Sequence, residues 1–96
     1  MRIVGRDRLH AFCLSHPDAR SWIEAWVHET EGMSWRRPQD IKNRYVTASF
    51  LLGNVVVFNV RGNNYRMEVQ VAYKVGVITV RWIGSHAEYD ERNRRR

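Results

Sequence analysis

Cysteine, lysine and long apolar runs are scarce in this sequence of 96 residues. The shortages of cysteine and of apolar runs each exclude a class of protein. The one cysteine, Cys13, excludes an internal disulfide and a metal site built from several thiolates. No apolar run approaches the roughly 20 residues that span a bilayer, and the charged residues 1–8 lack the apolar stretch of a signal peptide. We therefore expect a reduced, cytoplasmic protein with no membrane partner, no bound metal and no other cofactor.

Basic side chains outnumber acidic ones, and 14 of the 16 basic residues are arginine, which gives a formal net charge of +6. The planar guanidinium group suits phosphate better than the point charge of a lysine ammonium group. Part of the excess lies in residues 91–96, which we expect to form a flexible basic tail after a single domain over residues 1–90. The remainder falls within predicted sheet, on Arg61, Arg66, Lys74 and Arg81. This placement indicates an anionic partner.

Hydrophobic periodicity divides the chain into a helical first part and a β-rich second part. Apolar residues three and four apart predict a helix over about 6–14 and a second one that ends at Gly32, with a short third helix from Pro38. From residue 46 the period changes to two and predicts strands over 54–60, 64–73 and 77–83, with short ones at 3–4 and 48–51. We predict an α+β fold, with two or three N-terminal helices packed on one face of a mainly antiparallel sheet of four to five strands.

Two-residue turns set the register of the predicted hairpins. Gly62-Asn63 places Asn59 opposite Arg66, and a turn at Val75-Gly76 places Gln70 opposite Arg81 and Val69 opposite Trp82. One face is then apolar, includes Trp82, and forms the core. The other face carries Asn59, Arg61, Asn64, Arg66, Glu68, Gln70, Thr79 and Arg81. A solvated surface would also explain this face, but three arginines against one glutamate favour phosphate binding.

A histidine, a tyrosine and two carboxylates follow the last predicted strand, as His86, Glu88, Tyr89 and Asp90. Histidine accepts and donates protons near neutral pH, which suits the 2′-hydroxyl and the 5′-oxygen of RNA, while nearby arginines stabilise charge on the phosphate. From local spacing alone, a structural role for His86 at the strand end stays open.

Trp35 stands beside Arg36 and Arg37, away from the apolar stripes, and this placement predicts an RNA contact by base stacking. Glu68 is a less favoured candidate base, because a glutamate between two arginines can be their ion-pair partner.

Two segments carry a resemblance to a known family: residues 56–66, VVFNVRGNNYR, and residues 83–90, IGSHAEYD. With residues 16–19 and 35–42, they resemble the HigB toxins of bacterial type II toxin–antitoxin systems. The resemblance implies a RelE-like fold and ribosome-dependent cleavage of messenger RNA by an endoribonuclease that inhibits translation. It also implies neutralisation by a HigA-type helix-turn-helix antitoxin, through which the complex would reach operator DNA.

The motifs can be carried over residue by residue. Asn63 and Arg66 match the family's turn-and-strand motif, and His86 and Tyr89 match its C-terminal motif. Two positions depart from the pattern: Asn64 stands where a lysine is common, and Asp90 is followed by an acidic residue where a basic one is usual. Both departures weaken the local positive field.

The residues and the resemblance together give each candidate a role. We predict that Arg66 and Arg81 hold the scissile phosphate, that His86 is the general acid or base, and that Tyr89 orients the RNA. The approach would be lined by Arg61, Asn63 and Asn64, with Trp35, Arg36 and Arg37 as further RNA contacts. Two alternatives stay open: a basic RNA-binding module without catalysis, and a ParE-like toxin that targets gyrase.

Overall fold

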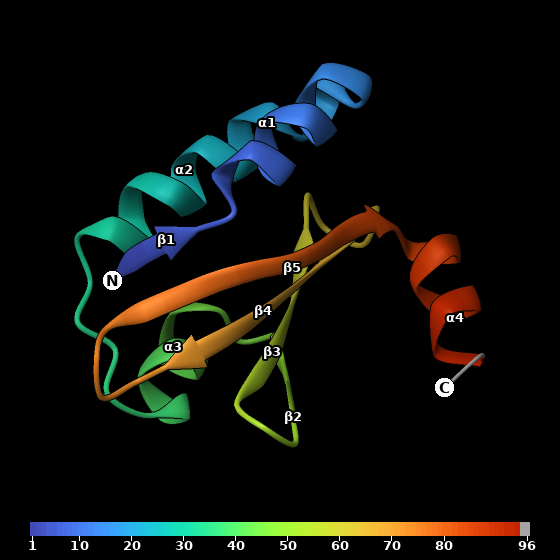
Figure 1. Ribbon diagram of the computed structural model, residues 1–96. Coiled ribbons are helices and arrows are strands. Elements are labelled where there is room, and N and C mark those ends of the chain that lie inside the picture. Colours follow the sequence, from blue (N-terminus) through green and yellow to red (C-terminus); the bar gives the residue numbers. More distant parts are fainter. Residues whose placement is uncertain (95–96) are drawn as a thin grey trace.

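Apolar periodicity of 3.6 and then of two along the chain produces helices followed by strands, as the computed structural model of residues 1–94 shows (Figure 1). The elements are β1 (Arg2–Val4), α1 (Arg6–Ser15), the 3₁₀ turn η1 (Pro17–Ala19), α2 (Arg20–Glu31), α3 (Pro38–Arg44), β2 (Ser49–Leu51), β3 (Val55–Val60), β4 (Tyr65–Ala72), β5 (Val77–Ser85) and α4 (His86–Arg94). The predicted α+β class is confirmed, and α4 adds one helix to the predicted set. Within residues 1–94, no helix has the length and apolar character to cross a bilayer.

The sheet has the strand order β1-β5-β4-β3-β2, and its pairs are antiparallel except for β1 beside β5. Alternate residues of β3, β4 and β5 are buried on one face, as Val56, Phe58, Val60, Met67, Val69, Val71, Ile78 and Val80. The same core contains Leu9 and Phe12 of α1, Trp26 of α2 and Ile41 of α3. Three N-terminal helices therefore cover one face of the sheet, as predicted.

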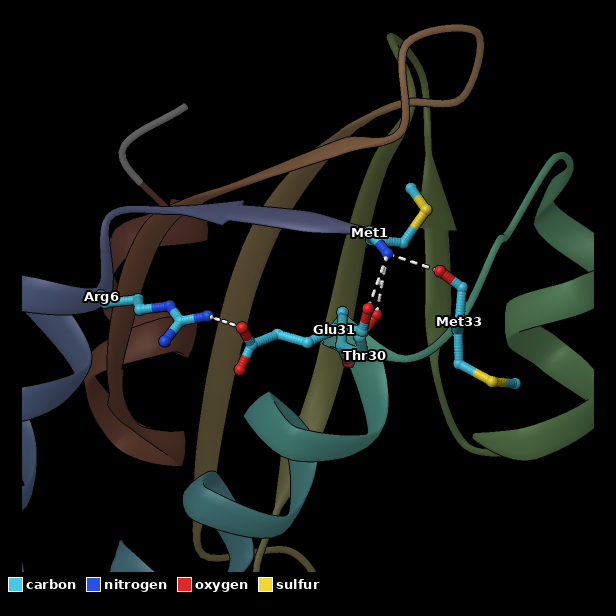
Figure 2. A network of polar contacts seen from close by, with 5 residues as sticks. All are labelled: Met1, Arg6, Thr30, Glu31 and Met33. Atoms are coloured by element: carbon cyan, nitrogen blue, oxygen red, sulfur yellow. Dashed lines mark hydrogen bonds and ion pairs between the residues drawn. The ribbon is translucent and has the colours of Figure 1, made fainter.

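The first residue of the chain joins β1 to the end of α2. Figure 2 shows the α-ammonium group of Met1 donating to the carbonyl oxygens of Thr30, at 3.1 Å, and of Met33. A positive charge at this position stabilises the carbonyl end of a helix. An ion pair between Arg6 and Glu31 ties α1 to the same end of α2. These contacts hold the two helices beside β1.

The register of the β3–β4 hairpin is as predicted, with Asn59 opposite Arg66. The chain reverses through residues 61–64, and Arg61 and Gly62 take φ angles of 51° and 66°. Glycine adopts this left-handed conformation without steric cost. The pairing of β3 with β4 that the turn residues predicted is therefore confirmed.

The predicted register of the β4–β5 hairpin is wrong. Its loop has four residues, 73–76, so Gln70 faces Thr79. A β-bulge follows, because Val69 pairs with Val80 while Glu68 pairs with Trp82, and Arg81 between them is the extra residue. Paired residues share a face, so the bulge moves the Trp82 side chain from the predicted core face to the opposite one.

The predicted basic tail overlaps the last helix of the structure. Residues 91–94 belong to α4, and Arg92 contacts Glu68, which lies on the sheet face opposite the core. Residues 95–96, which complete that predicted tail, lie outside the described residues. Figure 1 shows α4 beyond the C-terminal end of β5, at the opposite end of the sheet from the β4–β5 turn.

Candidate functional site

The turn between β3 and β4 and the start of α4 lie together at one end of the sheet. Strand pairing sets Tyr65 opposite Ser85 and Arg66 opposite Gly84. Beyond the last pair, the backbone N–H of His86 donates to the carbonyl oxygen of Asn64 at 3.1 Å. Residues 61–66 and 84–86, which are far apart in sequence, therefore form one local structure.

Arg66 is half-buried and directed toward the turn. Its Nη2 donates to Oδ1 of Asn63 at 2.9 Å, and its Nη1 approaches the carbonyl oxygen of Tyr65 at 3.4 Å. Both acceptors are neutral, and within residues 1–94 Arg66 forms no ion pair. The structure thus brings together the two residues of the turn-and-strand motif and leaves the guanidinium charge available for an anion.

His86 begins α4 and forms a pair with Asp90 one turn later. Its Nδ1 lies 3.1 Å from Oδ2 of Asp90, and both side chains are partly exposed. A carboxylate at this distance accepts the Nδ1 proton and so fixes the ring tautomer, which leaves Nε2 for proton exchange with another molecule. The sequence analysis named both residues but gave a role only to His86, although the spacing of four residues places both side chains on one helix face.

A capping box fixes the point at which α4 starts. The backbone N–H of Glu88 donates to Oγ of Ser85 at 3.1 Å, and Oε1 of Glu88 accepts the Ser85 N–H at 2.8 Å. The backbone N–H of Ser85 and, to a smaller extent, its hydroxyl group lower the pKa of the Glu88 carboxyl. The pattern Ser-x-x-Glu was visible in the sequence and would have predicted a helix from His86.

The other end of α4 is held to the sheet by a buried ion pair. Glu68 is 3% exposed, and its Oε1 accepts from Nη1 of Arg92 at 2.7 Å. The Arg92 guanidinium lies 5.2 Å from the ring centre of Trp82, which in turn lies 5.9 Å from that of Tyr89. Gly84 makes room for the indole, since a Cβ there would stand 2.6 Å from it. Tyr89 therefore packs beside Trp82, and the carboxylate of Glu68 forms an ion pair with Arg92.

Arg81 lies apart from Arg66, and Arg61 is paired with a carboxylate. Arg81 donates to Oε1 of Gln70 at 2.8 Å, and Gln70 is four residues along β4, about 13 Å, from Arg66. Arg61 pairs with Asp18 of η1 at 3.0 Å. Asp18 also accepts the hydroxyl of Tyr65, which raises the pKa of that tyrosine. Arg66 and Arg81 thus do not converge on one position.

The predicted stacking role of Trp35 is wrong, because Trp35 is 2% exposed and packs edge-on against Tyr45 in the core. The backbone N–H groups of Arg36 and Arg37 donate to Asp40 at the start of α3. Arg36 lines a groove together with the β4–β5 turn. The structure therefore places this basic pair at the end of the sheet opposite Arg66.

Groups of three or more His, Cys, Asp or Glu side chains that could hold a metal ion do not occur within residues 1–94. In a comparison with protein families, the model described as "HigB_toxin, RelE-like toxic component of a toxin-antitoxin system" matches residues 19–92. This range contains the turn, Arg66, the capping box and the His86–Asp90 pair. No curated protein matches the chain.

Proposed function

The chain belongs to the HigB_toxin family of RelE-like toxic components of toxin–antitoxin systems, and from this premise we propose that it is an endoribonuclease that cleaves messenger RNA on the ribosome. The observation that carries the proposal is the meeting of Arg66, Asn63 and His86 at one end of the sheet. An arginine and a histidine in one local structure supply the charge stabilisation and the proton transfer that RNA cleavage needs.

The proposed reaction is an internal displacement at phosphorus. The 2′-oxygen of the RNA attacks the neighbouring phosphate, its proton leaves, and the bond from phosphorus to the 5′-oxygen breaks as that oxygen gains a proton. Nε2 of His86 performs one of these two proton transfers. The products are a 2′,3′-cyclic phosphate and a 5′-hydroxyl. The step as written consumes no water molecule and requires no metal ion.

The other residues of the site support this step. Arg66 stabilises the negative charge that develops on the phosphate oxygens, and Asn63 orients its guanidinium. Asp90 holds Nδ1 of His86 and so orients the imidazole ring for proton transfer. Tyr89 borders the site from α4, and Asn64 holds the start of that helix through its carbonyl oxygen. Arg81, further along the face, would contact a different phosphate of the same strand.

The proposed partner that neutralises this activity is a HigA-type antitoxin with a helix-turn-helix domain. The family description supplies the toxin–antitoxin relationship. The helix-turn-helix domain would carry the complex to operator DNA, and cleavage on ribosomes would place the toxin in the cytoplasm.

The chemistry of the cut ends tests the proposed reaction. Messenger RNA is incubated with ribosomes and the purified protein, and the fragments are labelled at their 5′ ends with and without prior phosphatase treatment. We expect 5′-hydroxyl ends and 2′,3′-cyclic phosphates. Fragments with 5′-phosphates would contradict 2′-hydroxyl attack. Uncut RNA would instead support the binding module, and inhibition of DNA gyrase would support the ParE-like alternative.

A further inference from the structure

A groove with a volume of about 690 Å³ lies between the start of β1, the connector before α3 and the β4–β5 turn. It is lined by residues 1–2, 33–36 and 73–76. Tyr73, the first residue after β4, lies seven residues, about 23 Å of extended chain, from Arg66. The groove is therefore separate from the candidate cleavage site, and Figure 1 shows the β4–β5 turn at the opposite end of the sheet from α4.

The charged side chains that line the groove are all basic, and the carboxylate of Asp40 lies behind it, where it accepts from the backbone N–H of Arg36. The lining includes Arg2, Arg36 and Lys74, all exposed, and contains no carboxylate side chain. Within residues 1–94, these three side chains form no ion pair. Three cations held around one hollow attract an acidic group, and the attraction is strongest where the partner's approach excludes water.

The groove also carries features that favour a protein over a nucleic acid. Met33 and Val75 expose 37% and 73% of their surfaces there, and exposed apolar side chains within a basic rim are typical of protein interfaces. Nε1 of Trp35 and the hydroxyl of Tyr73 are buried without a hydrogen-bond partner in the described part of the chain. Burial raises the pKa of Tyr73 and so keeps its hydroxyl protonated, while an indole N–H can only donate. Both groups are therefore donors that lack an acceptor.

We propose that this groove is the docking site of the antitoxin, and that it receives a segment with acidic side chains and at least one apolar anchor. The carboxylates would pair with Arg36 and Lys74, and the anchor would cover Met33 and Val75. A carbonyl or carboxylate oxygen inserted between these walls would accept from Tyr73 after a small side-chain movement. The proposal rests on membership of a toxin–antitoxin family and not on the proposed cleavage reaction.

Charge reversal with a matched control tests the assignment. The double variant Arg36→Glu/Lys74→Glu is compared with Arg8→Glu/Arg20→Glu, which changes the net charge equally on α1 and α2 at exposed positions outside the groove. Binding of the purified antitoxin encoded with this chain is measured by titration calorimetry. We expect the groove variant to lose about 100-fold or more in affinity, since like charges facing each other across an interface oppose binding strongly, and the control to lose little.

Hydrogen exchange provides a second measurement on the unmodified protein. With the antitoxin bound, residues 33–36 and 73–76 should exchange more slowly than in the free toxin. Protection confined to other segments, or equal losses of affinity in both double variants, would overturn the proposal. If the groove variant binds the antitoxin normally but loses affinity for ribosomes, the groove is an RNA surface and the proposal is wrong.

Discussion

At the scale of single residues, the site depends on a histidine whose ring is oriented from its own helix. His86 has a backbone bond to Asn64 and a side-chain contact to Asp90, so both its position and its tautomer are fixed before any substrate binds. Such preorganisation means that removing the imidazole should affect the reaction far more than the fold.

The variant His86→Ala should therefore separate chemistry from binding. We expect a loss of about 10²- to 10⁴-fold in the cleavage rate, the usual contribution of a positioned acid or base. Ribosome affinity should change little, because the wider basic surface supplies most of it. Both quantities and the melting temperature are measured on the same preparations. A variant that melts earlier yet cleaves at the unmodified rate would assign His86 a structural role and would exclude it as the catalyst.

Asp90 acts through His86, and its variant should show a smaller and different effect. Asp90→Asn keeps the shape of the side chain but lets its amide group either donate to or accept from Nδ1, so the tautomer is no longer fixed. We expect kcat to fall by at least about 10- to 100-fold, the range seen when the hydrogen-bond partner of a metal-bound histidine is removed, while KM changes little. The control is Glu91→Gln, which removes a carboxylate from the next position of the same helix. Equal losses in both variants would contradict the positioning role.

At the scale of elements, α4 is attached by its first turn to β5 and the β3–β4 turn, and by Arg92 to β4. The variant Arg92→Met should lower the free energy of unfolding by about 1.5–3 kcal/mol, because a charged group hydrogen-bonded to the buried Glu68 is lost. Chemical denaturation gives this value. Arg94→Met, on the same helix with an exposed side chain, should change the free energy by less than about 0.5 kcal/mol. A similar, small effect of both variants would show that Arg92 does not hold the helix.

The strands and N-terminal helices were predictable because local signals and tertiary packing agree there. The Gly62-Asn63 turn predicted the register of β3 and β4 correctly. The apolar positions of α1 and α2 predicted the helix faces that pack in the core. The bulge at Arg81 was not predictable from alternation, because an extra residue leaves no compositional mark. Because of this bulge, Trp82 was assigned to the core face, whereas its ring lies beside Arg92 of α4. Trp35 was misread for a different reason: flanking charges said nothing about how deeply its ring is buried.

At the scale of the whole molecule, the two candidate sites lie at opposite ends of the sheet. The candidate cleavage site lies where β3 meets β4 and α4 begins, and the proposed antitoxin groove lies at the β4–β5 turn, about 23 Å of extended chain away. An antitoxin segment in the groove would leave His86 uncovered. The antitoxin would then neutralise the toxin sterically, because the complex would be too large to enter the ribosome.

This separation predicts that loss of catalysis leaves antitoxin recognition intact. Substitutions more than about 10 Å apart with no shared partners affect free energies independently, within 0.3–0.5 kcal/mol. The antitoxin should therefore bind His86→Ala with an affinity within about twofold of the unmodified toxin. Titration calorimetry with Arg36→Glu/Lys74→Glu in the same series shows that the assay detects a weakened interface. A tenfold loss of affinity in His86→Ala would mean that the antitoxin also contacts the start of α4, and the two ends would then have to be treated as one surface.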